Sequence, residues 1–377
     1  MPKNISNKFN AVILAGGKGE RLGLLSQNNP KSGLVFGVDY RLIDFAVCNL
    51  INSKVNNICC ILQYLPHIIM RHLTERYRKY EHIRFDFLTP YQSREGNISF
   101  LGTADAVWKN INFLSLDQYE HTIILPADHI YNFNLEEAMR FHHFSKTDVT
   151  LISTNVKKEN AVKYGNIVTD QHNTIIKFDE KPKSPTLATP NPLVSTGIYI
   201  FNNEVLKQIY LNFCEQGNLP NDFGYDTFPK IISSHTVKSF NLDTLNGDYY
   251  WNDIASIDDY CKSTFDFIDG LINLNGFFMK LTDKKRISDS FVSADFHRKN
   301  NSKIKIDHSI LFSNCEIGEG TLIQNSIVHP NVKIGKNCFI KDTFIPEGIS
   351  ISDSVSLEQF IPDQKFIDTF QHGFKLL

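Results

Sequence analysis

The sequence lacks any long apolar run, and no stretch approaches the ~20 residues that a membrane-spanning helix requires. It also lacks a Cys-x-x-Cys pair, and its seven cysteines are odd in number and scattered. This pattern argues against a structural zinc site and favours reduced thiols in a cytoplasm. Neither sign of charge is in excess, because 39 basic residues stand against 41 acidic ones. The balance argues against a nucleic-acid or polybasic membrane partner.

The composition is that of a globular protein. With 377 residues, of which 42% are hydrophobic and 21% charged, the chain is long enough for two domains and can bury a sizeable core. The first eight residues (MPKNISNK) have no apolar signal core, so we expect a short frayed tail and a cytoplasmic protein.

The stretch at residues 9–22 (FNAVILAGGKGERL) combines an apolar run with a glycine-rich loop. Such a run predicts a buried parallel strand, and ligands of open α/β sheets bind at the carboxyl ends of such strands. Gly16, Gly17 and Gly19 would let backbone N–H groups approach phosphate oxygens. Lys18 and Arg21 would add positive charge. We therefore predict a cradle for a nucleoside triphosphate.

Two known glycine patterns do not match this loop. The P-loop requires a Ser or Thr after Gly-Lys, and none follows here. The dinucleotide fingerprint requires Gly-x-Gly-x-x-Gly, and Leu22 stands where the last glycine would be. An ordinary turn between a strand and a helix remains an alternative for this loop.

Further candidates follow in the next segments. Lys31, in a turn-rich loop, is either a surface charge or a second cation on the triphosphate. Residues 41–53 and 67–77 have helical spacing, and residues 58–62 predict a second buried strand. Gln63 ends that strand, where its amide would read a base edge or cap a turn. Gly102 and Thr103 open another helix, whose N–H groups would point toward a ligand.

A second informative stretch runs through residues 122–129 (TIILPADH). Its apolar strand ends on Asp128, which should lie at the same sheet edge as the glycine loop. A carboxylate there suits Mg²⁺, which takes one or two carboxylates plus phosphate oxygens. Asp128 lies too far upstream to cap the predicted helix at 134–144, and His129 is interpreted as a packed histidine. Asp253, behind Tyr250 and Trp251, is the candidate partner carboxylate.

Strands are also predicted at residues 149–154, 165–169, 175–178 and 194–201. Lys181, between a strand and a proline, would be well held for a sugar-phosphate contact, although surface Lys-Pro turns are common. The strand at 194–201 begins with small residues, including Ser195, which leave room for a sugar. Residues 255–275 are predicted to form a helical linker.

The last third of the chain repeats aliphatic residues at a spacing of six. Leu311, Ile317 and Ile323 form one series, and Ile334 and Ile340 form another. This is the hexapeptide signature of a parallel β-helix, which we favour over a generic β-rich segment.

Together these stretches resemble the sugar-nucleotide pyrophosphorylases, and most closely the ADP-glucose pyrophosphorylase (glucose-1-phosphate adenylyltransferase) branch of bacterial type. The segments that carry the resemblance are AVILAGGKGERL (11–22), YRLIDFAVCNLINS (40–53), GTADAV (102–107), LPADHIY (125–131), FDEKP (178–182), STGIYIF (195–201), DFGYDTFPKII (222–232) and YWNDI (250–254). The resemblance implies an α/β fold. A Rossmann-like nucleotidyltransferase domain with a mixed, mostly parallel sheet (1–262) would precede a left-handed β-helix domain (276–377).

The resemblance also implies a reaction, in which ATP and glucose 1-phosphate give ADP-glucose and pyrophosphate with Mg²⁺, supplying glycogen or α-glucan synthesis. The implied catalytic residues are Arg21, Lys31 and Asp128, and the implied metal ligands are Asp128 and Asp253. The implied nucleotide contacts are Leu14, Ala15, Gly16, Gly17, Gly19, Gln63, Gly102 and Thr103. The implied sugar-phosphate contacts are Gly165, Glu180, Lys181 and Ser195. The β-helix would join subunits into a homotetramer or a hetero-oligomer with a sister subunit.

The sequence departs from the family pattern at several positions. Ala127 stands where a glycine is usual and adds a Cβ beside Asp128. Asn28, Asn29 and Asp39 stand where bacterial enzymes of this family often carry basic residues that bind anionic activators, so activation by sugar bisphosphates is expected to be weak or absent. A GDP-mannose or UDP-sugar pyrophosphorylase and a non-catalytic regulatory subunit remain alternatives.

Overall fold

The computed structural model describes residues 5–38, 40–90, 92–93, 96–97, 99–245, 249–272, 284–287, 289–293 and 303–361. The chain forms two compact units, each assembled from separate segments. The first unit contains residues 1–17, 45–127 and 131–251, and the second contains residues 18–44, 128–130 and 252–377. Each unit is described by itself below.

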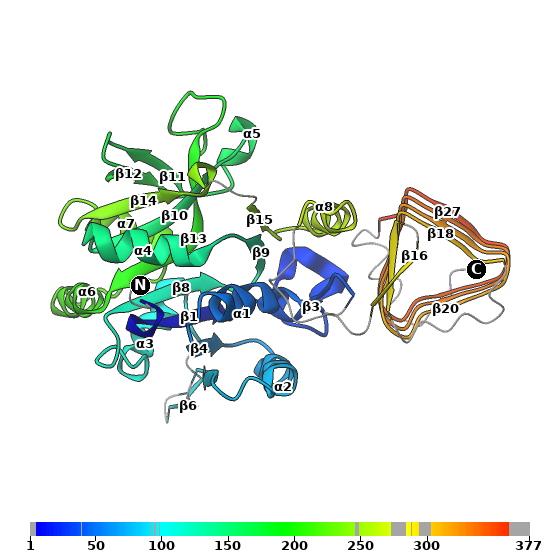
Figure 1. The fold of residues 1–377 in the computed structure, drawn as a ribbon, viewed down its shortest axis with the longest axis horizontal. Coiled ribbons are helices and arrows are strands. Elements are labelled where there is room, and N and C mark those ends of the chain that lie inside the picture. The colour runs from blue at the N-terminus through cyan, green and yellow to red at the C-terminus, as the bar shows by residue number, and fades with distance from the viewer. Residues whose placement is uncertain are drawn as a thin grey trace. The chain divides into compact units, whose positions relative to one another are not determined.

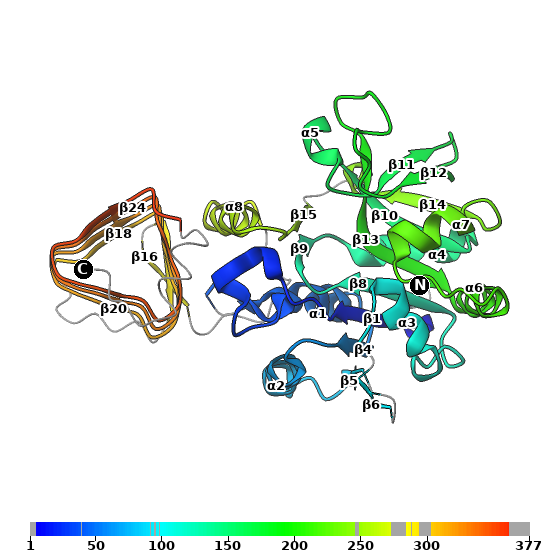
Figure 2. The same ribbon diagram turned by 180° about the vertical axis from the view of Figure 1, so that it is seen from behind.

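The first unit is built on a sheet with strand β1 at its centre. β1 (Phe9–Ala15) pairs in parallel with β4 (Asn57–Leu62) on one side and with β8 (His121–Pro126) on the other (Figures 1 and 2). Val12 and Ile13 are completely buried, as the apolar run predicts for a central parallel strand. The predicted strand and its parallel pairing are confirmed.

The rest of this sheet is mixed. β13 runs antiparallel to both β8 and β10, whereas β10 and β14 are parallel. The mixed, mostly parallel sheet predicted from the sequence is confirmed. Its other strands are β5 (Arg84–Leu88), β10 (Val149–Asn155), β11 (Asn166–Thr169), β12 (Ile175–Asp179), β13 (Leu193–Asn202) and β14 (Val237–Asn241).

Helices begin where the sequence supplies caps and apolar spacing. The Asn202 side chain accepts hydrogen bonds from the N–H groups of Glu204 and Val205, which starts α6. The α-helices are α1 (Leu42–Asn52), α2 (Pro66–Tyr77), α3 (Thr103–Lys109), α4 (Leu135–Ser145), α5 (Lys158–Ala161), α6 (Asn203–Glu215), α7 (Phe228–Ile231) and α8 (Ile257–Ile268). Helices predicted at 41–53, 67–77 and 134–144 are confirmed as α1, α2 and α4. A helix, α8, also lies within residues 255–275, and the interpretation of this segment as a linker stays a prediction.

Short turns of helix and short strands connect these elements. The 3₁₀ turns are η1 (Ser6–Lys8), η2 (Glu20–Ser26), η3 (Lys31–Gly33), η4 (Ile111–Phe113) and η6 (Leu242–Thr244), and η5 (Phe223–Thr227) is a turn of π-helix. The short strands are β2 (Val35–Phe36), β3 (Tyr40–Arg41), β6 (Gln92–Ser93), β7 (Gly96–Asn97), β9 (His129–Asn132) and β15 (Tyr250–Asp253). Throughout the part of the chain described, every helix is too short or too polar to cross a membrane.

The second unit ends in a parallel β-helix with three faces, which Figure 1 shows as the triangular stack of yellow to red strands. Ile306, Ile323, Ile340 and Leu357 follow one another in register along one face. The predicted series Leu311, Ile317, Ile323, Ile334 and Ile340 is buried throughout, so the hexapeptide interpretation is confirmed. The strands are β16 (Lys284–Ile287), β17 (Ser290–Ser293), β18 (Lys305–Asp307), β19 (Ile310–Leu311), β20 (Glu316–Ile317), β21 (Leu322–Gln324), β22 (Ile327–Val328), β23 (Lys333–Ile334), β24 (Phe339–Lys341), β25 (Phe344–Ile345), β26 (Ser350–Ile351) and β27 (Ser356–Glu358).

Within the second unit, α8 contacts both the segment after the glycine loop and the β-helix. The Tyr260 hydroxyl donates a hydrogen bond of 2.7 Å to the carbonyl of Val35. The Tyr260 ring packs edge-on against Phe36 and Phe344, each with ring centroids 6.1 Å apart. The predicted boundary between a catalytic domain ending at 262 and a β-helix domain starting at 276 falls partly on residues 273–283, outside the described part, and stays a prediction.

Candidate active site

The glycine-rich loop leaves the carboxyl end of β1. Gly19 has φ +77°, and a Cβ there would lie 3.0 Å from the Cβ of Lys31. A side chain is therefore disfavoured at Gly19 both by backbone conformation and by space. Gly17 differs, because a Cβ built on it meets nothing within 4 Å. The backbone shape of the loop thus depends on Gly19 rather than on Gly17.

Lys31 lies between two carboxylates that come from distant segments. It opens η3, directly after Pro30. Its Nζ lies 2.7 Å from Oδ2 of Asp128 and 3.3 Å from Oδ1 of Asp253. The side chain of Lys31 is only 10% exposed, and those of Asp128 and Asp253 are 30% and 22% exposed. The predicted meeting of Asp128 with Asp253 is therefore present, and Lys31 is a partner of both rather than a surface charge.

Burial and charge act in opposite directions on this cluster. Burial lowers the pKa of Lys31, but the attraction of Asp128 and Asp253 outweighs it, so the pKa of Lys31 is raised. Burial raises the pKa of Asp128, but the nearby Lys31 ammonium and His129 oppose it and bring the pKa of Asp128 down to about 2. At neutral pH the cluster therefore holds a protonated lysine beside an ionised carboxylate.

The same residues fit a divalent cation. Hard cations such as Mg²⁺ bind carboxylate oxygens and keep positions for phosphate oxygens and water. Asp128 and Asp253 supply such oxygens. The ammonium of Lys31 lies at hydrogen-bonding distance from both carboxylates, which shows that the two acids can hold one positive charge between them.

His129 belongs to this cluster, although the sequence assigned it no role beyond packing. Its Nε2 lies 3.4 Å from Oδ1 of Asp253 and 3.8 Å from Oδ1 of Asp128. Strand β9, which begins at His129, pairs with β15, which ends at Asp253, and this pairing accounts for the approach. No signal in the sequence pointed to it, because the two strands are far apart along the chain.

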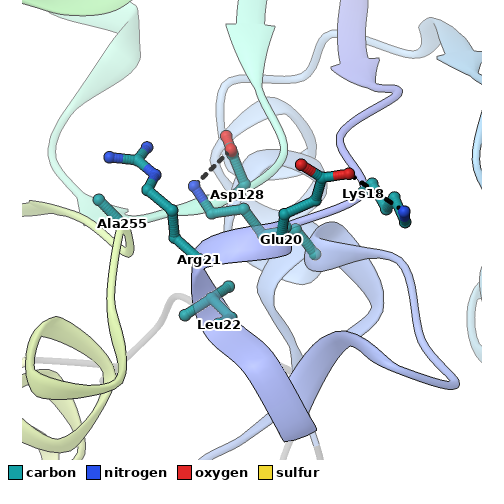
Figure 3. A pocket seen from close by; sticks show the side chains of 8 residues that line it. Lys18, Glu20, Arg21, Leu22, Asp128 and Ala255 are labelled. Atoms are coloured by element: carbon teal, nitrogen blue, oxygen red, sulfur yellow. Dashed lines mark hydrogen bonds and ion pairs between the residues drawn. The ribbon is translucent and has the colours of Figure 1, made fainter. Parts of the chain in front are cut away.

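A pocket of about 540 Å³ opens beside these residues within the second unit. Figure 3 shows Arg21 and Glu20 projecting from η2 to the same side as Asp128. Lys18 pairs with Glu20 at 3.1 Å, and both side chains are largely exposed. The residues that line the pocket are Lys18, Gly19, Glu20, Arg21, Leu22, Lys31, Asp128 and Ala255. Three predicted catalytic residues, Arg21, Lys31 and Asp128, are therefore brought to one pocket.

Ala127 occupies the position where a glycine is usual without disturbing the strand. Its side chain is fully buried, and its N–H donates a hydrogen bond of 3.0 Å to the carbonyl of Leu14. This bond ties the end of β8 to the end of β1, where Leu14 and Ala15 precede the glycine loop. The additional Cβ is accommodated inside the unit.

Some of the residues predicted to contact the nucleotide in the first unit form hydrogen bonds to other parts of the protein. Oε1 of Gln63 accepts a hydrogen bond of 2.6 Å from the N–H of Phe100, so Gln63 holds a backbone segment 37 residues further on. The N–H groups of Ala104 and Asp105, in the first turn of α3, both donate to the carbonyl of Asn221. These two N–H groups are therefore occupied by the backbone of residue 221, whereas a nucleotide contact at Gly102 or Thr103 stays a prediction.

The segment around Asn221 also encloses Gly102 and Thr103. A Cβ on Gly102 would lie 2.4 Å from the carbonyl oxygen of Asn221. The Thr103 hydroxyl donates a hydrogen bond of 2.9 Å to Oδ2 of Asp222. A small residue at 102 is therefore required by this close approach of two backbone segments.

The four predicted sugar-phosphate residues come together in the first unit. The N–H of Ser195 donates a hydrogen bond of 2.8 Å to the carbonyl of Gly165. A Cβ on Gly165 would lie 2.7 Å from Oε2 of Glu180. Glu180 is largely buried, and burial raises its pKa. Lys181 lies 3.4 Å from Glu180, but its side chain is half exposed, so only its backbone is firmly held.

Two further residues of this group were missed by the sequence reasoning. A Cβ on Gly224 would lie 2.4 Å from Oε2 of Glu180, so only glycine leaves room for that carboxylate. The Lys181 ammonium lies 6.0 Å from the centre of the Tyr225 ring. Both belong to the stretch DFGYDTFPKII, which carried part of the resemblance but contains no pattern with a chemical meaning of its own.

The positions associated with activators are only partly described. Oδ1 of Asn29 accepts a hydrogen bond of 3.4 Å from Nη1 of Arg41, which also donates to the carbonyl of Gly33. Asn28 is exposed, and Asp39 lies outside the described residues. Arg41 is therefore engaged with the loop that follows the glycine-rich segment.

Comparison with known proteins agrees with this geometry. The family model described as nucleotidyl transferase matches residues 10–269, and the one described as GlmU-like, C-terminal hexapeptide matches residues 277–359. The glucose-1-phosphate adenylyltransferase of Thermosipho africanus is 33% identical over 83% of this chain and 77% of its own length. Those of Clostridium novyi and Mycoplasma mobile are 30% and 31% identical, each over 85% of this chain, and over 85% and 86% of their own lengths.

The first family model covers well over half of the chain, and the relatives align along most of their length. The range matched by the first model contains the glycine loop, the carboxylate cluster and the sugar-phosphate group described above. Such nucleotidyltransferases generally use a divalent metal, and the carboxylate cluster fits one. The chain therefore belongs to the nucleotidyl transferase family and, within it, to the glucose-1-phosphate adenylyltransferases.

Proposed function

We propose that this protein forms ADP-glucose and pyrophosphate from ATP and glucose 1-phosphate. The observation that supports this most directly is that Lys31 and Asp128 line the same pocket as Arg21 and Gly19, while Lys31 also contacts Asp253. Acidic and basic side chains gathered in this way suit the transfer of a nucleotidyl group. The names of the relatives supply the base and the sugar.

The reaction is a single displacement at phosphorus. A phosphate oxygen of glucose 1-phosphate attacks the α-phosphorus of ATP, and the bond from that phosphorus to the bridging oxygen breaks to release pyrophosphate. Charge accumulates on the phosphate oxygens, so positioning and neutralisation do most of the work. Arg21 and Lys31, which both line the pocket, would neutralise that charge. No covalent intermediate on the protein is required.

The metal in this proposal is Mg²⁺, held by Asp128 and Asp253. When bound, Mg²⁺ would neutralise phosphate oxygens and orient the triphosphate. Lys31 keeps the two carboxylates together, because its ammonium contacts both. Their separation is then already small before substrate arrives.

The remaining roles follow the same assignment. Glu180 would accept hydrogen bonds from sugar hydroxyls, Lys181 would contact the sugar phosphate, and Gly165 and Ser195 would shape the space around them. The nucleotide would lie against the ends of β1 and β4 and the start of α3, at Leu14, Ala15, Gly16, Gly17, Gly19, Gln63, Gly102 and Thr103. We further propose a cytoplasmic homo-oligomer, or a hetero-oligomer with a sister subunit, that supplies glucan synthesis.

The test is pyrophosphate release by the purified chain alone, with each of the four common nucleoside triphosphates and with glucose 1-phosphate or mannose 1-phosphate. We expect ATP with glucose 1-phosphate to be preferred. The Asp128→Asn variant should lose about two to four orders of magnitude in kcat/KM, because an electrostatic group at the reacting phosphates is removed. Asp117→Asn is the matched control, since Asp117 is 91% exposed and pairs with the Lys207 side chain at 2.6 Å.

Full activity of Asp128→Asn would contradict the proposed site. Preference for GTP with mannose 1-phosphate, or for UTP, would contradict the proposed substrates but would agree with the proposed active site. A chain without any activity, alone or with each substrate pair, would favour a regulatory role.

A further inference from the structure

A second group of potential metal ligands lies at the opposite end of β8 from the candidate active site. Glu120 precedes the strand, His121 is its first residue, and His143 lies in the last turn of α4. All three belong to the first unit, and none has a role in the proposed reaction. They form one of the two groups of side chains in the described residues with the number and spacing of ligands that a metal ion needs; the other is the carboxylate cluster.

The three ligand atoms form a compact triangle. Nε2 of His121 lies 3.1 Å from Nδ1 of His143. Oε2 of Glu120 lies 3.9 Å from each of these two nitrogens. A tetrahedral zinc ion with bonds of about 2.0–2.1 Å keeps its ligand atoms about 3.3 Å apart. The triangle therefore needs only small side-chain movements to close around an ion.

The ionisation states suit metal binding at neutral pH. Burial lowers the pKa of His121 to about 4, and the neighbouring His143 acts in the same direction, so the His121 imidazole is neutral and carries a lone pair. The pKa of Glu120 is lowered by its hydrogen bond to Lys8, so Glu120 is ionised. His121 is nearly buried, whereas the side chains of His143 and Glu120 are 22% and 54% exposed, which gives an ion access from solvent.

Neighbouring groups define which atoms can bind. Nδ1 of His142 is 2.9 Å from the Thr150 hydroxyl, so His142 faces the core and is not a ligand. Its ring packs edge-on against His121 at 4.8 Å. Nζ of Lys8 lies 2.9 Å from each carboxylate oxygen of Glu120. Lys8 can keep its contact with Oε1 of Glu120 while Oε2 binds an ion.

We propose that Glu120, His121 and His143 bind a zinc ion through Oε2, Nε2 and Nδ1, with water as the fourth ligand. Two imidazoles and one carboxylate are a zinc donor set, and imidazole favours zinc over magnesium. The ion would fasten the carboxyl end of α4 to the amino end of β8. Binding at Nε2 leaves the His121 proton on Nδ1, which is buried without a hydrogen-bond partner in the part of the chain described, and this weakens the binding of the ion.

The experiment compares zinc binding by the full chain and by two variants, after chelator treatment and in excess Mg²⁺. His143→Gln removes one ligand. His172→Gln removes an exposed histidine from a turn, where it contacts the Gln171 side chain, and is the matched control. We expect wild type and His172→Gln to bind one more zinc ion per chain than His143→Gln, measured by equilibrium dialysis. Glu120→Gln should weaken the same site, and serves if His143→Gln does not fold.

Two further measurements do not depend on activity. Zinc should raise the melting temperature of wild type and of His172→Gln but not of His143→Gln, because an ion that binds only the folded state stabilises it. The ¹⁵N chemical shift of His121 Nε2 should change on adding zinc, because this nitrogen exchanges its contact with Nδ1 of His143 for a bond to the metal. Equal zinc stoichiometry and affinity in wild type, His143→Gln and Glu120→Gln would overturn the proposal. That result would leave the proposed function untouched, since none of these residues takes part in it.

Discussion

Lys31 is the residue on which the candidate site depends most. Its ammonium contacts Asp128 and also Asp253, which lies 222 positions away in the sequence. Removing one partner of a largely buried group of charges leaves the others uncompensated, which costs far more than an exposed pair would gain. Lys31 is therefore both a candidate contact for substrate and a condition for the two acids to approach one another.

We predict that Lys31→Met lowers the melting temperature at pH 7 and that the loss shrinks in acid. The pKa of Asp128 in the folded protein is about 2, below its usual value of 3.8, so the stability it contributes is present above about pH 4 and is lost as pH falls toward 2. Without Lys31, burial and the neighbouring Asp253 would raise the pKa of Asp128. Protonation of Asp128 in acid would then remove the uncompensated negative charge that destabilises the variant. Melting curves of both proteins between pH 7 and pH 3 measure the difference.

The matched control for this prediction is Lys18→Met. Lys18 pairs with Glu20 at 3.1 Å on the surface of the same loop, and exposed pairs contribute about 0–1 kcal/mol. Its melting temperature should stay near that of wild type across the range. A Lys31→Met protein whose deficit is the same at every pH would contradict the electrostatic explanation.

Gly224 offers a second prediction at the scale of one residue. A Cβ there would lie 2.4 Å from Oε2 and 2.6 Å from Cδ of Glu180, so Gly224→Ala must displace that carboxylate. We expect the KM for glucose 1-phosphate to rise by about tenfold, the cost of losing roughly one hydrogen bond to a charged group, with little change in the KM for ATP. Steady-state kinetics with each substrate varied in turn separate the two.

A double variant decides whether Gly224 acts through Glu180. If it does, Gly224→Ala should add little to the effect of Glu180→Ala, because two changes that remove the same interaction are not additive. Additive losses would show that the methyl group disturbs something else.

The glycine-rich loop is an element whose shape and function can be tested separately. Gly19 has φ +77° and little space, so Gly19→Ala should cost about 1–2 kcal/mol of stability from the left-handed backbone alone. Gly17→Ala meets no neighbour and should unfold like wild type. Thermal unfolding of the two variants gives the comparison.

The kinetic behaviour of Gly17→Ala then tests the proposed cradle. If phosphate oxygens approach this backbone, the added methyl group should raise the KM for ATP although the fold is intact. An unchanged KM would show that the nucleotide does not approach the backbone at this position.

Elements with a strong periodic pattern were the ones that the sequence predicted well. β1, β4 and β8 are mostly apolar and buried, α1 is buried over residues 42–50, and α4 buries one face, so local pattern and tertiary packing agree. The start of α3 was predicted less completely, because a capping pattern describes only the helix itself. Whether its N–H groups stay open depends on the carbonyl of Asn221, more than a hundred residues further on.

The same limit explains which parts of the site could be predicted. Lys31, Asp128 and Asp253 were each marked by local context, but only the fold shows that the lysine lies between the acids. His129 and Gly224 carried no local signal, because their importance comes from neighbours in other strands and turns. Residues that act through a distant partner are beyond what spacing along the chain can reveal.

At the scale of the whole protein, we predict that fructose 1,6-bisphosphate changes the rate of ADP-glucose formation little. Asn28 and Asn29 are neutral amides, and Arg41 is bonded to the carbonyl of Gly33 and to Asn29. An anion gains little from neutral amides compared with ammonium or guanidinium groups. Initial rates at limiting ATP, with and without the bisphosphate, are the measurement, and a large stimulation would refute the prediction.

The regular coil of the β-helix limits how its length can change in evolution. Hydrogen bonds such as that from the N–H of Ser326 to the Ser309 hydroxyl join residues 17 positions apart, and each coil pairs only with its neighbours. A duplication or deletion of a complete coil keeps every aliphatic side chain inside. Insertions of any other size would turn the following isoleucines outward, so natural length variants of this region should differ by whole coils or carry their extra residues as loops at the corners.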